Sequence, residues 1–207
     1  MPKPGFITAS QFSIVMQGSR NKKDIFGESA KKYAARIACD IIGVDTSDIE
    51  EVSSRSLEHG NLWEPVAVAA YIEKTLYNVT NINENQVFLI HPDLPYVGGH
   101  PDGLVNRDGV LEVKNPDNIV NHFFNVVNGL QIKQYTPQIQ GNLSISGRDW
   151  CDFVSYDYRY PKDGKISIRR VYRDEAYIKI LENRFIMFWD LVQNYVDLFS
   201  NTPKIIF

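Results

Sequence analysis

The sequence predicts a single domain of the α/β (α+β) class that occupies residues 1–207. Segments whose apolar residues recur at helical spacing alternate with short segments rich in β-branched and aromatic residues, which is typical of helices and strands that share one core. The length is that of one domain. Hydrophobic residues make up 43% of the chain, which suffices for a sizeable core.

A short helix is expected close to the N-terminus, with Thr8 or Ser10 as its N-cap. An uncovered helix N-terminus also attracts anions, although a plain cap is the favoured interpretation of these residues taken alone. The apolar residues of this helix are Phe12, Val15 and Met16.

Two longer helices are expected next, over residues 25–42 and 54–77. Gly43 follows the first one and ends it, because glycine readily adopts the left-handed conformation found after helices. Pro65 interrupts the second one. Proline lacks the backbone donor of the helical hydrogen bond, so this helix either kinks there or restarts with Pro65 in its first turn.

Strands dominate the second half of the chain until a long final helix. Pro137 is expected in or near the first turn of its helix, where proline is tolerated. The apolar stripe of the final helix is expected mainly to pack in the core. Because it is rich in aromatic residues, a contact with another subunit is also compatible with it. The expected elements are a strand at 86–90, a β-hairpin within 98–116, a short helix or a mobile segment at 118–128, a helix at 133–146, strands at 150–158 and 166–172, and a helix at about 174–200.

The hairpin carries the residues on which the functional prediction depends. Glu112 and Lys114 are two positions apart, so a strand projects both side chains to one face. Asp102 lies on the other arm. Two carboxylates bind a hard divalent cation such as Mg²⁺, which polarises a phosphoryl oxygen and helps convert water into a nucleophile. A lysine beside them positions that water and neutralises developing charge. The three residues suit phosphodiester hydrolysis.

The face that Asp102 occupies depends on the hairpin loop. We expect a three-residue loop at 107–109 that pairs Asn106 with Val110. Counting back along the strands, Asp102 then faces Lys114 and shares a side with Glu112. A loop one residue longer or shorter would send Asp102 to the opposite face.

The trio of charges is a weak signal by itself, because Asp, Glu and Lys are common on exposed hairpins. Glu64, beside Trp63 at the predicted helix break, is likewise either a helix-start acid or a functional one, and alone it would be assigned a structural role. The histidines at positions 59, 91 and 122 have no metal-ligand spacing and are taken as structural.

The composition excludes several classes of protein. The chain has no apolar run long enough to cross a membrane, and its first residues lack the apolar core of a signal peptide. Cys39 and Cys151 form neither a disulfide framework nor a metal-ligand pattern, which favours a reducing cytoplasm. The net charge of −3 gives no overall attraction to nucleic acid, so a DNA partner must be held by local contacts.

Further motifs along the chain resemble the lambda exonuclease family, also called YqaJ-type viral recombinases, of the PD-(D/E)XK nuclease superfamily. The resemblance rests on five motifs in order and covers most of the chain. It implies a restriction-endonuclease-like core with a central mixed β-sheet flanked by helices. The motifs are 5-Gly-Phe-Ile-Thr-Ala-Ser-10, 60-Gly-Asn-Leu-Trp-Glu-64, Asp102, 112-Glu-Val-Lys-114 and 138-Gln-Ile-Gln-140.

The resemblance assigns roles to individual residues. Asp102 and Glu112 match metal-binding acids, and the Val113 carbonyl matches a backbone ligand. Glu64 matches the helix acid of the second metal position. Lys114 matches the lysine that positions the attacking water.

The resemblance also implies a 5′-phosphate pocket. Ser10 matches a serine of that pocket, and Gln138 matches a glutamine near the metals and the terminal phosphate. The family pattern has arginine where Lys3 stands and serine where His100 stands. Lysine keeps the charge but loses the bidentate geometry of arginine, and His100 either contacts phosphate or packs.

The activity implied by the resemblance is a Mg²⁺-dependent exonuclease that digests one strand of duplex DNA from its 5′ end, with Mn²⁺ as a substitute and two ions at each site. The implied partners are DNA ends, a homotrimeric ring and a single-strand annealing protein in phage recombination. One rival is an endonuclease of the same fold, which would nick closed circles. The other is a non-catalytic DNA-binding scaffold, against which the intact Asp102, Glu112 and Lys114 argue.

Overall fold

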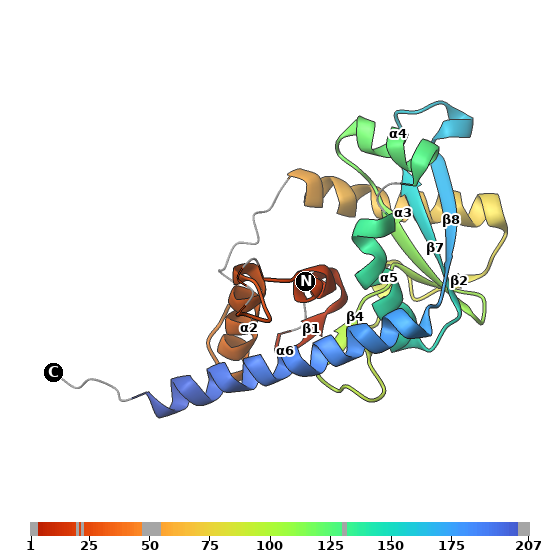
Figure 1. Ribbon diagram of the computed structural model, residues 1–207. Helices are drawn as coiled ribbons and strands as arrows, with labels where there is room; N and C mark the ends of the chain where they lie inside the picture. Colours follow the sequence, from red (N-terminus) through yellow and green to blue (C-terminus); the bar gives the residue numbers. More distant parts are fainter. Residues whose placement is uncertain (1–3, 20, 22, 47–54, 130–131, 203–207) are drawn as a thin grey trace.

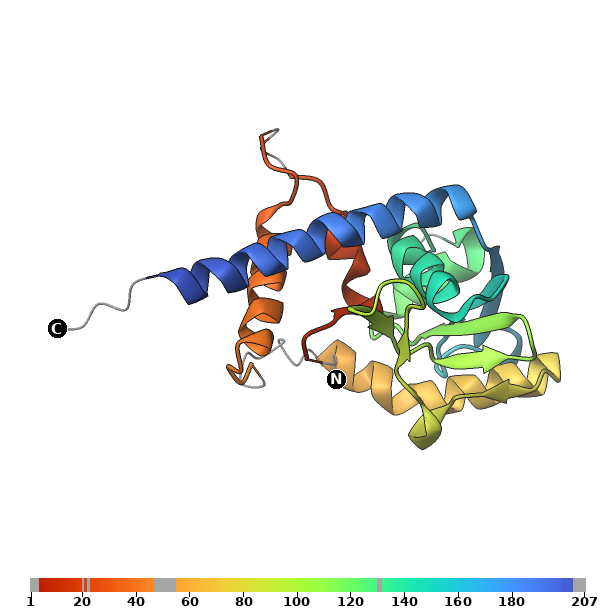
Figure 2. The same ribbon diagram turned by 90° about the horizontal axis from the view of Figure 1, so that it is seen from below.

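The computed structural model describes residues 4–19, 21, 23–46, 55–129 and 132–202. It confirms the predicted mixed α/β class, with mixed β-sheets flanked by helices (Figures 1 and 2). No described helix is long and apolar enough to cross a membrane. Both cysteines are free. The helices are α1 (Phe12–Met16), α2 (Glu28–Ile41), α3 (Arg55–Thr75), α4 (Ile119–Asn128), α5 (Ile132–Ser146) and α6 (Glu175–Asn201).

The larger sheet has the strand order β2-β5-β6-β7-β8 and places β6 at its centre. Strands β6 and β7 are parallel, whereas the other neighbouring strands are antiparallel. A parallel pair needs a long crossover connection, which α4 and α5 supply. The strands are β2 (Val79–Thr80), β5 (Gly103–Val105), β6 (Gly109–Lys114), β7 (Trp150–Tyr156) and β8 (Ile166–Tyr172).

The two faces of β6 pack against different helices, which lie on opposite sides of the sheet in Figure 2. Leu111 and Val113 pack with apolar residues of α3. Val110 packs with apolar residues of α5. Because side chains alternate along a strand, Glu112 and Lys114 share the face of Val110 and point toward α5.

A smaller sheet with the order β1-β4-β3 lies beside α5 and the 3-10 turn Ala9–Gln11. Two glycines of β4 allow close packing there, because a Cβ at Gly98 would lie 2.4 Å from the Phe88 ring and one at Gly99 would lie 2.7 Å from Ala9 Cβ. The strands are β1 (Ile7–Thr8), β3 (Leu89–Ile90) and β4 (Val97–Gly99).

The final helix forms as predicted and runs along one side of the molecule (Figure 1). Asp174 caps it, because its Oδ1 accepts a hydrogen bond of 3.0 Å from the Tyr177 amide. Its apolar stripe is the predicted core face and packs against α1 and α2. The buried residues of this stripe are Ile178, Leu181, Phe185, Phe188 and Val192.

Both helix-interior prolines lie within continuous helices, which excludes one of the two alternatives predicted for Pro65. Helix α3 continues through Pro65, so the predicted restart is wrong. The carbonyl that would have received the missing hydrogen bond belongs to Asn61, which is exposed and can bind water instead. Pro137 lies beyond the first turn of α5, which begins at Ile132, and the matching carbonyl belongs to the exposed Lys133.

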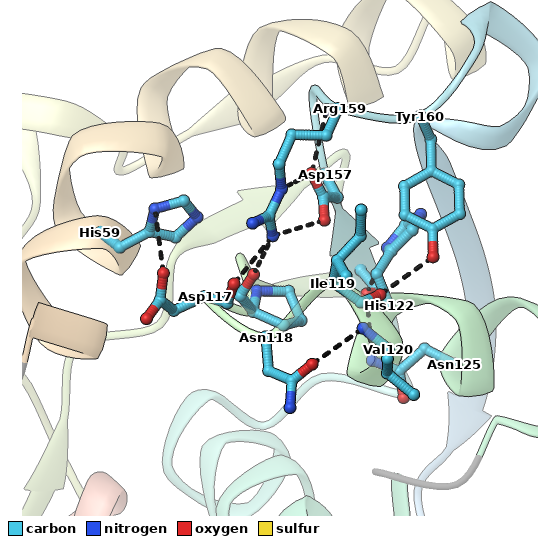
Figure 3. Close-up of polar contacts among 12 residues, drawn as sticks. His59, Asp117, Asn118, Ile119, Val120, His122, Asn125, Asp157, Arg159 and Tyr160 are labelled. Atoms are coloured by element: carbon cyan, nitrogen blue, oxygen red, sulfur yellow. Dashed lines mark hydrogen bonds and ion pairs between the residues drawn. The ribbon is translucent and has the colours of Figure 1, made fainter.

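Several short elements also differ from the prediction. The strand expected at 86–90 contains only Leu89–Ile90. The two-residue strands β1 and β2 are too short to show the alternation that predicts a strand. Of the two alternatives for 118–128, the helix is correct: the Asn118 side chain accepts a hydrogen bond of 3.0 Å from the Val120 amide (Figure 3), and Gly129 ends the helix with a φ of 61°.

Candidate active site

Strand β6 carries the carboxylate and the lysine that the sequence pattern singles out. Glu112 is fully buried, and Lys114 Nζ donates a hydrogen bond of 2.5 Å to Glu112 Oε1. Burial alone would lower the pKa of Lys114, but the negative charges of Glu112 and Asp102 outweigh it, so the pKa is raised. Lys114 is therefore a fixed cation at the end of the central strand.

Asp102 lies on the predicted face, although the predicted loop is wrong by one residue. The loop contains residues 106–108, and Val105 pairs with Gly109. The pairing register is therefore shifted by two residues from the predicted one, and an even shift keeps each side chain on its predicted face. If the pairing of β5 with β6 is continued by one residue, Asp102 lies opposite Glu112 instead of Lys114. The left-handed residue is Asn106, with a φ of 46°. Gly109 serves close packing instead, because a Cβ there would lie 2.2 Å from the Trp150 ring.

The Asp102 carboxylate sits in an environment that disfavours its charge. Burial and repulsion by Glu112 raise its pKa well above the ordinary value, against the opposing attraction of Lys114. Its Oδ2 accepts a hydrogen bond of 2.6 Å from the Val113 amide. This bond fixes the carboxylate beside the strand that carries Glu112.

Glu64 approaches the same group of charges from α3. Burial raises its pKa, and repulsion by Glu112 adds to that effect, so the two carboxylates are close enough to interact. Gln86 Nε2 donates a hydrogen bond of 3.2 Å to Glu64 Oε1. One turn earlier, Asn115 Nδ2 donates a hydrogen bond of 3.1 Å to the Gly60 carbonyl. This contact holds α3 against the end of β6.

Helix α5 brings polar side chains to the face of the sheet on which Glu112 and Lys114 lie. Lys114 Nζ lies 4.7 Å from the centre of the Tyr135 ring, and Asn142 Nδ2 donates a hydrogen bond of 3.2 Å to Glu112 Oε2. Gln138 is three residues after Tyr135 and four before Asn142, so it lies on the same helix face between them. The sequence reasoning found Gln138 but missed Tyr135 and Asn142, which helical spacing from Gln138 would have indicated.

The donor atoms at this site suit a hard cation such as Mg²⁺. Asp102 and Glu112 offer carboxylate oxygens, and three carboxylates share one lysine, an excess of negative charge that a cation would balance. Among the described residues, no three His, Cys, Asp or Glu side chains form a group able to hold a metal ion. Mg²⁺ does not require one, because it commonly binds one or two carboxylates together with water and phosphate. The metal assignment stays a prediction.

Comparison with known proteins now identifies the family. The family model described as the YqaJ-like viral recombinase domain matches residues 3–149. The chain belongs to this family. A search of curated proteins gives no significant match.

Solved structures agree with membership of the YqaJ-like family. An alkaline exonuclease, LHK-Exo from Laribacter hongkongensis, is 30% identical with a TM-score of 0.80, and its complex with dAMP is 31% identical with a TM-score of 0.81. Each alignment covers 95% of this chain and 92% of the LHK-Exo chain. A phage-related exonuclease from Haemophilus somnus 129PT is 17% identical, with a TM-score of 0.71 and coverage of 94% and 95%; this likeness concerns the fold alone.

The predicted 5′-phosphate pocket is only partly described. Lys3 lies outside the described residues. Ser10 is exposed in a 3-10 turn before α1. Thr8 precedes that turn without a side-chain cap, and the N-cap of α1 is Gln11, so neither predicted residue caps this helix. With five residues, α1 is too short to act as an anion site through its dipole. Exposed His100 follows β4, and its ring lies 5.0 Å from that of Phe88. The role of these residues in binding phosphate stays a prediction of the YqaJ-like pattern.

Proposed function

We propose that this YqaJ-like chain is a Mg²⁺-dependent exonuclease that digests one strand of linear double-stranded DNA in the 5′-to-3′ direction. The family and the similarity to alkaline exonuclease structures support the nuclease part of the proposal. The observation that carries it is the convergence of Asp102, Glu112 and Glu64 on the single cation of Lys114.

The side chains divide the work of phosphodiester hydrolysis. Asp102, Glu112 and Glu64, with the Val113 carbonyl, are the groups that would hold one or two Mg²⁺ ions. A bound Mg²⁺ supplies Lewis acidity that polarises the phosphoryl oxygen and lowers the pKa of water. Lys114 has three N–H donors, and Glu112 Oε1 accepts one of them. The others are available to orient the attacking water and to stabilise negative charge on the phosphate.

Binding of the DNA end is assigned to residues beside this group. Gln138, between Tyr135 and Asn142 on α5, donates to the terminal phosphate from the side of Lys114. Ser10, Lys3 and His100 complete a pocket for the 5′ phosphate, as the family resemblance implies. The complex of LHK-Exo with dAMP supports a nucleoside monophosphate as the product.

The cellular role follows from the family. We infer that the enzyme works in the bacterial cytoplasm, as part of phage-type recombination with a single-strand annealing protein. A homotrimeric ring around DNA would keep the enzyme on its substrate without a strongly basic surface, which fits the net charge of −3. Light scattering at the working concentration should give three times the chain mass, and a monomer mass would exclude the ring.

The decisive experiment digests linear duplexes labelled at either the 5′ or the 3′ end, with 5′-phosphate and 5′-hydroxyl versions of each. With Mg²⁺, the 5′ label should be released first as a mononucleotide, and 5′-phosphate ends should be attacked faster. Covalently closed circles should stay intact. Nicked circles would support the endonuclease, and equal rates on both kinds of 5′ end would contradict the phosphate pocket.

The role of Lys114 is tested by its replacement. Lys114→Ala should lower the rate of nucleotide release by about 10²–10³-fold, because it removes a preorganised cation from the reacting phosphate. Lys179→Ala, at an exposed position on α6, is the matched control and should keep the full rate. Circular dichroism should show that both variants are folded. Nucleotide release by Lys114→Ala at the parental rate would refute the catalytic assignment.

A further inference from the structure

Asn142 holds the buried Glu112 from the side opposite Lys114. Its Nδ2 donates to Glu112 Oε2 at 3.2 Å, while Lys114 Nζ donates to Glu112 Oε1 at 2.5 Å. Asn142 is itself 2% exposed. The carboxylate is therefore gripped at both oxygens, one from its own strand and one from α5. Each oxygen keeps a further lone pair that can bind another group.

The other end of the Asn142 amide has no hydrogen-bond partner in the described part of the chain. Asn142 Oδ1 is buried, and no donor reaches it. The amide does not gain by turning around, because its oxygen would then meet the negative carboxylate of Glu112. An unsatisfied buried acceptor carries a free-energy penalty, which a leucine of similar size would avoid. Packing alone therefore does not explain an amide at this position.

Gly99 provides the space in which Asn142 sits. A Cβ at Gly99 would lie 2.9 Å from Asn142 Oδ1 and 2.7 Å from Ala9 Cβ. The amide is thus confined between the end of β4 and the Glu112 carboxylate on β6. Any side chain at position 99 would push it toward that carboxylate or out of line with it.

We propose that Asn142 is a positioning residue that fixes the orientation of the Glu112 carboxylate toward a divalent cation, and that Gly99 is required to seat it. Asn142 acts through Glu112 and touches no reacting atom. This inference rests on the proposed function, because it concerns the cation site of the same enzyme. Removal of a residue that orients a metal ligand typically weakens metal binding by about 10- to 100-fold.

The test measures Mn²⁺ binding without DNA, by calorimetry or by the electron paramagnetic resonance signal of free Mn²⁺. Asn142→Leu keeps the volume but loses the donor, and it should raise the Kd for Mn²⁺ by about 10- to 100-fold. Gln140→Leu is the matched control. Gln140 is an equally buried amide on α5, but it bonds the Tyr172 carbonyl and the Asp174 amide instead of a carboxylate. Its replacement should lower the melting temperature and leave the Kd within twofold.

Two further variants keep the inference testable if Asn142→Leu does not fold. Asn142→Ser retains a hydroxyl donor and should weaken Mn²⁺ binding less than the leucine variant. Gly99→Ala should weaken Mn²⁺ binding by displacing the Asn142 amide. Adding Asn142→Ser to Gly99→Ala should weaken Mn²⁺ binding little further, because both changes act on the same contact. If the parent chain binds Mn²⁺, then parental affinity in folded Asn142→Leu or in Gly99→Ala would overturn this inference and leave the proposed function intact. Absence of Mn²⁺ binding and digestion in the parent would overturn the proposed function as well.

Discussion

Two sets of carboxylates lie at or near the neighbouring strands β6 and β7 and differ in how they are paired: Glu112, Asp152 and Asp157 are buried, and Asp102 and Glu64 are half-buried. Asp152 and Asp157 on and after β7 are each saturated by an arginine. Asp102, Glu112 and Glu64 share one lysine. The comparison shows that pairing with an arginine distinguishes a carboxylate that stabilises the fold from one available for chemistry.

Asp152 illustrates the paired set. Its oxygens accept hydrogen bonds of 2.8 Å from both Nε and Nη2 of Arg170 and one of 2.7 Å from the Tyr71 hydroxyl. The same guanidinium stacks over the Trp150 ring, 3.6 Å from its centre. These contacts tie β7 to β8 and α3 and leave Asp152 with little capacity for another ligand.

Asp157 is paired with an arginine that also anchors the connection between β6 and α4. Arg159 donates to it through its amide at 3.0 Å, Nε at 2.8 Å and Nη2 at 2.7 Å (Figure 3). The same Nη2 donates to the carbonyls of Pro116 and Asp117, which connect β6 to α4. Burial alone would raise the pKa of Asp157, but the bonds from Arg159 outweigh it and lower the pKa.

Asp102 and Glu64 show the opposite pattern, whereas Glu112 is paired with Lys114. Asp102 accepts one described backbone hydrogen bond, and Glu64 accepts one from a neutral amide. The pKa of each is raised, by burial first and then with repulsion from Glu112 adding to it. A raised carboxylate pKa means that the negative charge is unfavourable in the folded chain. This is expected of carboxylates that bind a cation when no cation is present.

The largest expected effect comes from removing the charge of Asp102, one of the candidate-site carboxylates. Asp102→Asn should reduce Mg²⁺-dependent digestion by about 10³-fold, because a metal ligand is lost. Its raised pKa means that the ionised carboxylate destabilises the fold once the pH exceeds its ordinary pKa. In EDTA at neutral pH the variant should therefore melt at a higher temperature than the parent chain.

The control for that variant lies in the same hairpin. Asp108→Asn changes an exposed turn residue and should alter neither digestion nor melting temperature. A fall in the melting temperature of Asp102→Asn in EDTA would place Asp102 with the structural carboxylates and break the distinction.

Breaking the paired set should cost stability instead of activity. Arg170→Leu leaves the buried charge of Asp152 without its cation, and it should lower the free energy of unfolding by about 3 kcal/mol. That loss corresponds to roughly 6–12 °C in melting temperature for a chain of this size. Urea titration measures it, and the digestion rate per folded molecule should stay at the parental value. A variant that stays stable but inactive would assign Asp152 to the catalytic set.

How far the sequence predicts these two sets depends on the range of the contacts involved. Strand alternation places Glu112 and Lys114 on one face, because it is a local property of the backbone. The hairpin register needed tertiary information, because Asn106 and Gly109 both tolerate a left-handed φ. The Trp150 ring packs on Gly109 from the neighbouring strand β7, which is distant in the sequence.

The partners of the candidate-site carboxylates are even harder to predict from local sequence patterns. Asn142 and Tyr135 reach the site because α5 packs on one particular face of β6, and Gln86 reaches Glu64 from a loop 22 residues away. The motif of Asp102, Glu112 and Lys114 supplies the chemistry of the site, but its supporting residues follow from packing between elements that composition and periodicity do not fix.

The pH dependence of stability sharpens the comparison further. A depressed pKa means that Asp157 stabilises the fold above the ordinary pKa of aspartate, and that this contribution disappears as the pH falls through the lowered value. Asp157→Asn should cost about 2 kcal/mol at pH 7, and its stability should fall less than the parent's between about pH 5 and pH 2. Thermal melts over that range measure both slopes, and parallel curves would contradict the pairing argument.

The smallest expected effect concerns the neutral partner of Glu64. Gln86→Leu removes a 3.2 Å hydrogen bond that lowers the pKa of Glu64, so the carboxylate should be less readily ionised and less well oriented. One hydrogen bond of this kind is worth about 0.5–1.5 kcal/mol, which predicts a loss of digestion rate of roughly two- to tenfold. Glu64→Gln should lower the digestion rate further than Gln86→Leu does. The double variant should be no slower than Glu64→Gln, because Gln86 acts only through Glu64. If the effects of the two changes were additive, Gln86 would act on DNA or the cation independently of Glu64. If Gln86→Leu alone lost as much activity as Asp102→Asn, Gln86 would belong with the residues that bind the reacting groups.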